Sequence, residues 1–442
     1  MTATDTTVTA PGDDERMFQI VRRVLNLPSL VRRPLASSLR LVPVPTARLL
    51  AFMVSPEIRA NPWSLYAKLR RKRPVMRIPP GIWLVARHDD AARLARDPRL
   101  GVDEHKSKWP PTQSLGPFSD VMGHSMLFID PPDHDRLRRL VARSFTPKRV
   151  EELRPRVKEL GARRIDALTP LGRADVLAEL AYPLPVDVIC EMLGVPEHDR
   201  DLFPGWARTL AARLDISPFR TPEIERAGDE AAAELSAYLD GLITDPSKRV
   251  AGGLIDALVA SEESGDRLTH QEVISTCGLL LIAGYETTAN LIGNGLLALL
   301  GSPAQLAALR AGDVTAESAV EELLRHDGPV QMTQRIALED IEVGGQQIEK
   351  GDVVILLLSA ANRDPAVFAE PDALRLDRDP NPHLAFSYGI HACLGASLAR
   401  LEAAEVLREL VDRFPNLRLD GKPKFRNTFV LRGLESLPLA WD

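Results

Sequence analysis

The loop around Cys393 places a single thiol between two glycines, in the stretch Phe386-Ser-Tyr-Gly-Ile-His-Ala-Cys-Leu-Gly395. A helical pattern follows, and the free N–H groups at a helix N-terminus stabilise a thiolate. Gly389 and Gly395 let the backbone approach a flat object closely. A thiolate on such a loop suits a soft metal ion. A redox-active thiol and an inert buried cysteine are the alternative interpretations.

The other two cysteines, Cys190 and Cys277, fall in apolar helical patterns, where we expect them to be small buried hydrophobic side chains. The three cysteines show no CxxC or zinc-ligand spacing. A low, odd number of cysteines favours a reducing compartment, so we expect a cytoplasmic protein.

A second group of reactive residues lies in the apolar stretch 269–300, which contains Ala283-Gly-Tyr-Glu-Thr287. Gly284 and Thr287 share a helix face, and the Thr287 hydroxyl can turn back to the Ala283 carbonyl. A glycine beside a freed carbonyl leaves room for a diatomic gas. For Glu286, a structural salt bridge is the alternative to a role in chemistry.

The cysteine loop continues as Ala-Ser-Leu-Ala-Arg400, and together these residues resemble the haem-binding loop of the cytochrome P-450 family. The resemblance implies haem b, with Cys393 as the axial ligand of the iron. It also implies that His391 faces a haem propionate and that Phe386 shields the sulfur. Ser387 stands where many relatives have glycine. Further contacts with haem are expected from Ala283, Gly284 and Gly395.

The resemblance extends to the helix 269–300, which is similar to the helix that carries the acid–alcohol pair of this family. It implies that Thr287 orders water and hydrogen-bonds the bound dioxygen. Glu286 would help to relay protons.

Propionate partners are implied by Asp130-Pro-Pro-Asp-His-Asp-Arg-Leu-Arg138, which resembles the family segment whose His and Arg contact a propionate. His134 and Arg138 lie at i and i+4 on one face, and Arg335 matches a third such residue. Charge-assisted partners offset the desolvation of two propionates in an apolar cleft.

Glu322 and Arg325 lie at i and i+3 and resemble the E-x-x-R structural pair of the family. In many relatives a third arginine joins this pair, but Ala373 stands at its position here. Arg375 and Arg378 are the candidates to replace it.

The implied reaction is the insertion of one oxygen atom from O2 into a lipophilic small molecule. The sequence shows no dinucleotide fingerprint and no iron–sulfur cysteine set, so electrons would come from a separate ferredoxin and ferredoxin reductase. A peroxide-using peroxygenase and a non-catalytic haem-thiolate binding protein are the alternatives. The substrate pocket is expected to be apolar; its predicted lining is Phe118, Met122, Leu127, Leu280, Val330, Met332, Phe429 and Val430.

These residues need a mainly α fold with a minor β region, in which haem is sandwiched between the helix 269–300 and the helix after Cys393. The helical patterns cover residues 61–73, 88–97, 133–146, 148–168, 175–194, 198–213, 221–244, 250–263, 269–300, 315–327 and 394–414. Short strands are expected at 75–78, 82–86, 335–338, 341–349 and 353–358. We expect a single domain over residues 56–442.

The chain of 442 residues has a net charge of −6, which argues against nucleic acid as a partner, and we expect a monomer. The helix 269–300 is long enough to span a membrane, but Glu286 and Asn290 interrupt it and Thr269 with Glu272 predicts a capping box, so we interpret it as a core helix. Residues 1–55 are predicted to be a flexible extension. Its stretch 16–56 contains seven arginines and no acid. Loose packing on the domain is favoured over weak contact with an anionic membrane surface.

Overall fold

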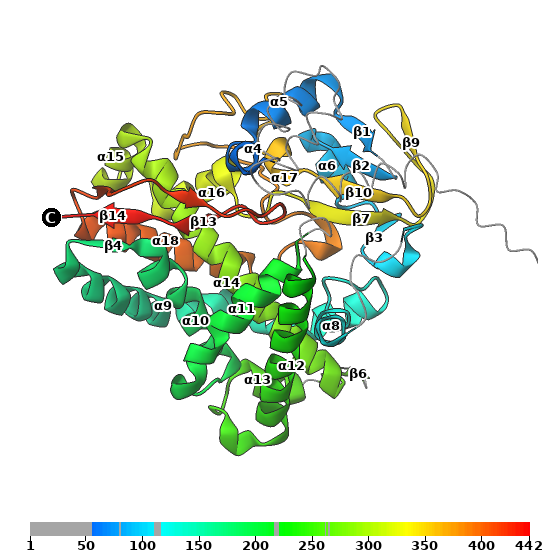
Figure 1. The fold of residues 1–442 in the computed structure, drawn as a ribbon, viewed down its shortest axis with the longest axis horizontal. Helices are drawn as coiled ribbons and strands as arrows, with labels where there is room; N and C mark the ends of the chain where they lie inside the picture. The colour runs from blue at the N-terminus through cyan, green and yellow to red at the C-terminus, as the bar shows by residue number, and fades with distance from the viewer. Residues whose placement is uncertain (1–54, 79–80, 110–115, 216–220, 261, 264–265) are drawn as a thin grey trace, which may run out of the picture.

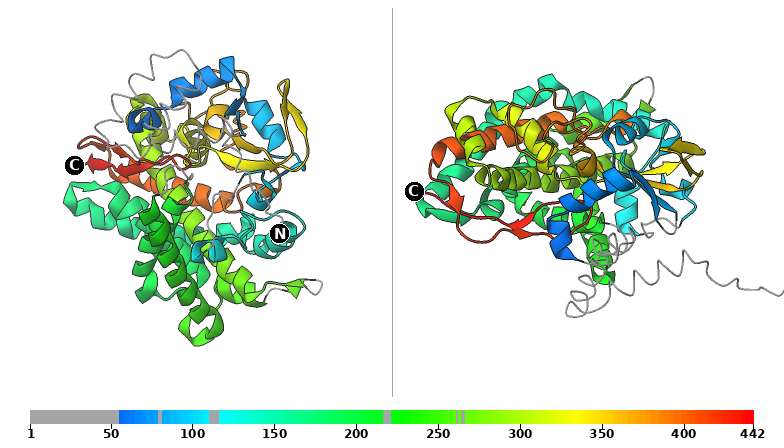
Figure 2. Two further views of the ribbon diagram at one scale, coloured as in Figure 1. Left: turned by 45° about the vertical axis from the view of Figure 1, so that its right-hand side comes forward. Right: turned by 90° about the horizontal axis from the view of Figure 1, so that it is seen from above.

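The computed structural model describes residues 55–442 except 79–80, 110–115, 216–220, 261 and 264–265. A mainly helical body carries a smaller β region at one side (Figures 1 and 2), as the sequence predicted. The helices are α4 (Pro56–Ala60), α5 (Trp63–Lys72), α6 (His88–Leu94), α7 (Pro117–Met122), α8 (Asp133–Ala142), α9 (Pro147–Leu168), α10 (Pro183–Leu193), α11 (Phe203–Arg213), α12 (Pro222–Thr244), α13 (Leu254–Ala260), α14 (His270–Leu300), α15 (Pro303–Ala311), α16 (Ala316–Asp327), α17 (Leu358–Ala361) and α18 (Ala396–Arg413). The predicted extension lies outside the described residues except for Ser55, the N-cap of α4.

A five-stranded sheet has the order β1-β2-β10-β7-β3, formed by β1 (Val75–Ile78), β2 (Ile82–Val85), β10 (Val353–Leu356), β7 (Thr333–Ala337) and β3 (Leu100–Gly101). Strand β10 runs parallel to β2 and antiparallel to β7, where Arg335 lies opposite Val354. Alternate side chains of β10 enter two different apolar clusters, because successive residues of a strand point to opposite faces. The sheet therefore fixes Arg335 between two packed layers.

The remaining strands are short and pair locally or near the C-terminus. They are β4 (Arg173–Asp175), β5 (Glu262–Glu263), β6 (Asp266–Arg267), β8 (Ile341–Val343), β9 (Gln346–Ile348), β11 (Arg418–Leu419), β12 (Lys424–Phe425), β13 (Leu434–Ser436) and β14 (Pro438–Ala440). The hairpin of β8 and β9 turns at Gly344 and Gly345, which both have positive φ and divide the strand segment predicted at 341–349.

Helix α14 runs through the centre of the molecule and packs on α10, α11, α16 and α18. The capping box predicted at its start is confirmed: the Thr269 side chain accepts from the Glu272 N–H, and the Glu272 carboxylate accepts from the Thr269 N–H. Most of the helix is buried on all sides. Within the described residues no single helix meets the length and hydropathy needed to cross a membrane, and α14 does so only together with α15 across a bend of 108°.

The fold corrects four details of the predicted secondary structure. The helix predicted at 175–194 starts later, because Arg173–Asp175 pairs with β14, and a π-helical segment at Leu177–Ala181 precedes α10, which begins at Pro183. The predicted helix 250–263 is shorter, since α13 covers Leu254–Ala260. Helices α15 and α7 were not among the helices predicted from the sequence.

Candidate active site

The loop that carries Cys393 is held by the backbone on both sides of the thiol. The Cys393 N–H donates to the Phe386 carbonyl at 2.9 Å, and Gly395 is the N-cap residue of α18. Gly389 has φ +77°, and a Cβ there would collide with the backbone oxygen of Ala95. Only glycine fits this position, because it combines a left-handed backbone with a close approach to another chain segment. The thiol is thus placed on a rigid turn directly before a helix, as predicted.

The charge state of the Cys393 thiol is set by opposing influences. The Cys393 side chain is exposed, yet desolvation by the surrounding protein raises its pKa above the ordinary value, while the Gly395 N–H and the guanidinium groups of Arg138 and Arg400 lower it. Desolvation outweighs these groups, so the helix N-terminus expected to stabilise the thiolate does so only in part. A metal ion bound to the sulfur would supply the remaining stabilisation, since a coordinating thiol is deprotonated outright.

Arg400, in the first turns of α18, connects the cysteine loop to α16. Its guanidinium lies over the Phe386 ring at 4.5 Å and donates to Glu321 at 2.5 Å. His383 Nε2 also contacts Glu321, at 3.0 Å. Burial raises the pKa of the Glu321 carboxyl, but the hydrogen bonds from His383 and Arg400 outweigh it and lower this pKa to about 2. Phe386 is therefore fixed beside the loop by a charged neighbour.

Three buried nitrogens near this loop have no hydrogen-bond partner among the described residues: Nε2 of His134, Nε2 of His391 and Nη2 of Arg335. The two imidazole rings lie 4.3 Å apart. Burial lowers the pKa of His391 to about 3 and that of Arg335 to about 10. Buried polar nitrogens without partners are costly, so an anionic ligand that accepts from Arg335 Nη2, and from each ring nitrogen that carries a proton, would stabilise the site.

Arg138, the fourth predicted propionate partner, has a different contact. Its Nη2 donates to the Ala392 carbonyl at 2.7 Å, directly before Cys393 in the chain. In this structure Arg138 therefore supports the cysteine loop, and a propionate contact by its other nitrogens stays a prediction.

Helix α14 has a short accessible face within an otherwise buried helix. Ala283 is exposed, and Gly284 and Thr287 are partly exposed. The Thr287 hydroxyl donates to the Ala283 carbonyl at 2.6 Å, as the sequence suggested. A Cβ added at Gly284 or at Gly395 would meet no atom within 4 Å. Both glycines therefore border open space, which a flat cofactor would need.

Glu286 is 1% exposed and forms an ion pair with Arg426 at 2.6 Å, while Asn290 Nδ2 contacts its second oxygen at 3.4 Å. This is the structural salt bridge that the sequence left open as an alternative. Glu286 and Arg426 also line a cavity of about 530 Å³ with Tyr182, Arg208 and Asp215. No spacing in the sequence could have indicated these lining residues, because they come from distant segments.

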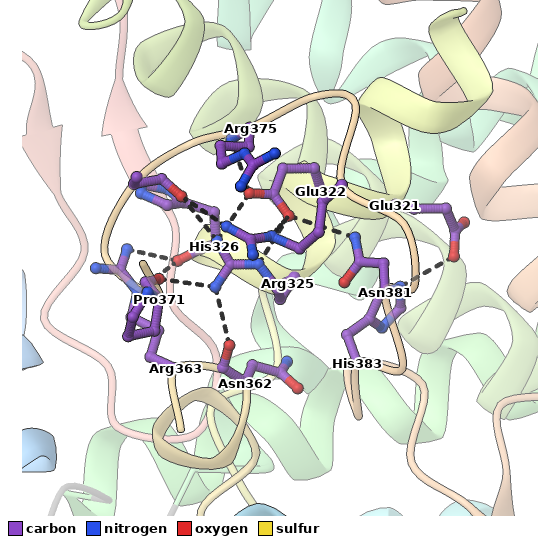
Figure 3. Close-up of polar contacts among 12 residues, drawn as sticks. Glu321, Glu322, Arg325, His326, Asn362, Arg363, Pro371, Arg375, Asn381 and His383 are labelled. Atoms are coloured by element: carbon purple, nitrogen blue, oxygen red, sulfur yellow. Dashed lines mark hydrogen bonds and ion pairs between the residues drawn. The ribbon is translucent and has the colours of Figure 1, made fainter. Parts of the chain in front are cut away.

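Glu322 and Arg325 form the predicted buried pair, with the guanidinium donating to both carboxylate oxygens at 2.7 and 2.8 Å (Figure 3). The third arginine is Arg378, whose Nε donates to Glu322 at 3.0 Å. Arg375, the other candidate, contributes only its backbone N–H at 2.9 Å. Asn381 adds a contact at 3.3 Å. Arg378 therefore takes the part of the third arginine, which is absent at Ala373, from a position further along the same loop.

The predicted substrate pocket is brought together only in part. Phe118 and Met122 have no exposed surface and pack in the largest core cluster, so the structure does not place them on a cavity wall. Leu127 is 42% exposed, whereas Leu280 and Met332 are buried. The segments that carry Val330 and Val430 lie side by side, since Val330 bridges to Leu431 and the Gln331 N–H donates to the Val430 carbonyl. Phe429 is partly exposed, and of the eight residues only Val430 lines the 530 Å³ cavity.

Comparisons with known proteins agree with this geometry. The Cytochrome P450 family model matches residues 43–312 and 315–435. The cytochrome P450 monooxygenase PikC of Streptomyces venezuelae is 43% identical, over 87% of this chain and 92% of the relative. The vitamin D(3) 25-hydroxylase of Pseudonocardia autotrophica is 41% identical, over 86% of this chain and 94% of the relative.

Among solved structures, P450BioI in complex with hexadec-9Z-enoic acid ligated acyl carrier protein superposes with a TM-score of 0.82. The two chains are 38% identical, and the match covers 87% of this chain and all of that one. The chain belongs to the cytochrome P450 family, and it is an oxidoreductase of the monooxygenase type. The predicted fold class is confirmed.

Proposed function

We propose that this chain binds haem b through Cys393 and inserts one oxygen atom from O2 into a lipophilic small molecule. The observation that carries the proposal is the set of unpartnered buried nitrogens on His134, His391 and Arg335 close to the cysteine loop. Haem brings two propionate carboxylates, which are suitable acceptors for the Arg335 guanidinium and for imidazole nitrogens that carry a proton. The open space at Gly284 and Gly395 fits the flat ring.

Haem, when bound, supplies the iron at which dioxygen is activated. The chain's own residues then control water and protons. The Thr287 hydroxyl donates to a backbone carbonyl, so its oxygen is left as an acceptor that can order a water molecule. The carboxylate of Glu286 is held in an ion pair with Arg426. Glu286 can therefore deliver a proton to the site only if this carboxylate moves away from Arg426 or if water molecules connect it to the site.

A lipophilic substrate is supported by similarity to a vitamin D(3) 25-hydroxylase and to P450BioI, whose structure contains hexadec-9Z-enoic acid ligated acyl carrier protein. The cavity beside Glu286 is not assigned to the substrate, because Ala283, Gly284 and Thr287 are not among the residues that line it.

Electrons are proposed to come from a separate ferredoxin and its reductase. The basic residues between Arg136 and Arg149 are a candidate docking face for an acidic iron–sulfur protein, and ion pairs within the chain already neutralise part of this face. Arg136 pairs with Glu272, and Arg149 pairs with Glu152 at 3.2 Å. We propose a cytoplasmic location, because the low, odd number of cysteines favours a reducing compartment. We also propose that the protein is a monomer.

The decisive test has two parts. The dithionite-reduced protein should give the red-shifted carbon monoxide band typical of thiolate-bound haem, and Cys393→Ser should lose it. NADPH-dependent product formation with a surrogate ferredoxin system should exceed formation with peroxide alone. Turnover by peroxide alone would instead indicate a peroxygenase, and binding without turnover in either system would indicate a non-catalytic binding protein.

A further inference from the structure

The charge of this chain is distributed very unevenly along the sequence. Residues 58–88 contain eight lysines and arginines and no aspartate or glutamate. Residues 89–442, in contrast, contain 40 basic and 56 acidic residues. Soluble surfaces usually mix both signs, so a region of a single sign on an otherwise acidic domain needs a separate explanation.

The basic residues of this region gather on one surface of the fold. Lys68, Arg71 and Lys72 lie at i, i+3 and i+4 on α5, on the side away from the residues that α5 buries. Arg73 is the C-cap residue of the same helix. Arg87 follows close by, because the Ala86 N–H donates to the Pro74 carbonyl and joins the two segments. In Figure 1 α5 lies at the outer edge of the molecule beside β1 and β2.

We call Lys68, Arg71, Lys72, Arg73 and Arg87 the α5 cationic face. All five are exposed, and none makes an ion pair or a side-chain hydrogen bond within the described part of the chain. Other exposed arginines form ion pairs, as Arg413 does with Asp166 and Arg418 with Asp442. The nearest acid in sequence, Asp89, contacts His88 at 3.3 Å. The charge of the face is therefore presented to solvent without compensation.

We propose that the α5 cationic face binds an anionic lipid surface. Charge alone would fit any acidic partner, but the sequence leading into α4 and α5 combines arginine with apolar residues. Residues 16–54 carry seven arginines, no acid and many leucines and valines. A bilayer surface is the partner that uses both properties, since its headgroups attract the cations and its acyl boundary accepts the apolar side chains.

The proposal is tested with the full chain and vesicles in a co-sedimentation assay. Binding is expected to phosphatidylcholine vesicles that contain phosphatidylglycerol, and not to phosphatidylcholine alone. It should weaken at high ionic strength, because salt screens exposed charges. Each basic residue near an anionic bilayer strengthens binding roughly fivefold. The combined variant Lys68→Gln, Arg71→Gln, Lys72→Gln and Arg73→Gln should therefore lose at least tenfold in its partition coefficient.

The matched control removes the same number of exposed, unpaired charges from other surfaces, as Lys158→Gln, Lys350→Gln, Lys422→Gln and Lys424→Gln. It should bind vesicles like the unmodified chain. Equal losses in the two variants would show an effect of net charge alone and would overturn the assignment. Full vesicle binding by the α5 variant would also overturn the assignment. The same holds if the unmodified chain binds no vesicles while the α5 variant loses ferredoxin-supported reduction. None of these readouts depends on the identity of the substrate.

Discussion

The buried network around Glu322 allows a quantitative prediction, because two arginines compete for the role of third partner. Arg378 is 6% exposed in its side chain and donates a charge-assisted hydrogen bond to Glu322 at 3.0 Å. In Arg378→Met this bond is lost, but Glu322 keeps the two bonds from Arg325. The expected loss of unfolding free energy is about 1.5–3 kcal/mol, the contribution of a hydrogen bond to a charged group.

Two further variants bracket this value. Glu322→Ala leaves Arg325, which is fully buried, without its carboxylate, and should cost about 3–5 kcal/mol or prevent recovery of folded protein. Arg375→Ala should cost less than about 0.5 kcal/mol, because that side chain is 41% exposed and its bond to Glu322 comes from the backbone.

The measurement is thermal unfolding followed by circular dichroism, together with haem content. At roughly 2 cal/mol/K of unfolding entropy per residue, a domain of this length loses about 1 °C in its midpoint for each kcal/mol. Arg378→Met should therefore lie about 2–3 °C below the unmodified protein, and Arg375→Ala should coincide with it. A larger loss for Arg375→Ala than for Arg378→Met would refute the assignment of the third arginine.

Three other outcomes are expected. Thr287→Ala should keep haem and substrate binding but divert electrons to hydrogen peroxide, and unchanged coupling of NADPH use to product would contradict its role in ordering water. Ser387→Gly should stabilise the fold by about 0.5–1 kcal/mol and so raise the thermal midpoint by about 1 °C, because Ser387 has φ +55° and a buried hydroxyl without a partner. Ser387→Ala should show no such gain. Burial and the nearby Arg363 lower the pKa of His326 to about 4. The unfolded chain therefore takes up a proton first, and stability should fall between pH 6.5 and pH 4 by at most about 1.4 kcal/mol per pH unit. A stability profile with the same slope in His326→Gln would exclude this residue as the cause.

Features that depend on local spacing could be predicted from the sequence. The capping box at Thr269, the return of the Thr287 hydroxyl to Ala283 and the pairing of Glu322 with Arg325 each involve residues three or four positions apart on one helix. Helix geometry alone brings such residues together. The cysteine loop was recognisable for a similar reason, since its glycines and its helix start lie within ten residues.

Features that depend on distant segments could not be predicted in the same way. The helix predicted at 175–194 includes Asp175, the last residue of β4, because only the pairing of this strand with β14 near the C-terminus shows that Asp175 is extended. Phe118 and Met122 were chosen for their apolar character, but that character is equally typical of core residues, and they are packed in the core. The choice of Arg378 over Arg375 follows from the path of a loop, which spacing does not determine.

Glu286 shows most clearly why neighbouring residues need not share a role. Successive residues of a helix are roughly 100° apart around its axis, so Glu286 and Thr287 can point to different surroundings. Thr287 lies with Ala283 and Gly284 on the accessible face of α14, whereas Glu286 meets Arg426 from the C-terminal hairpin, 140 positions away. The ion pair of Glu286 with Arg426 lies at the wall of a cavity that other polar residues also line, including Arg208 and Asp215. The two neighbouring residues of α14 therefore face different surroundings, and a part of Glu286 in proton transfer stays a prediction.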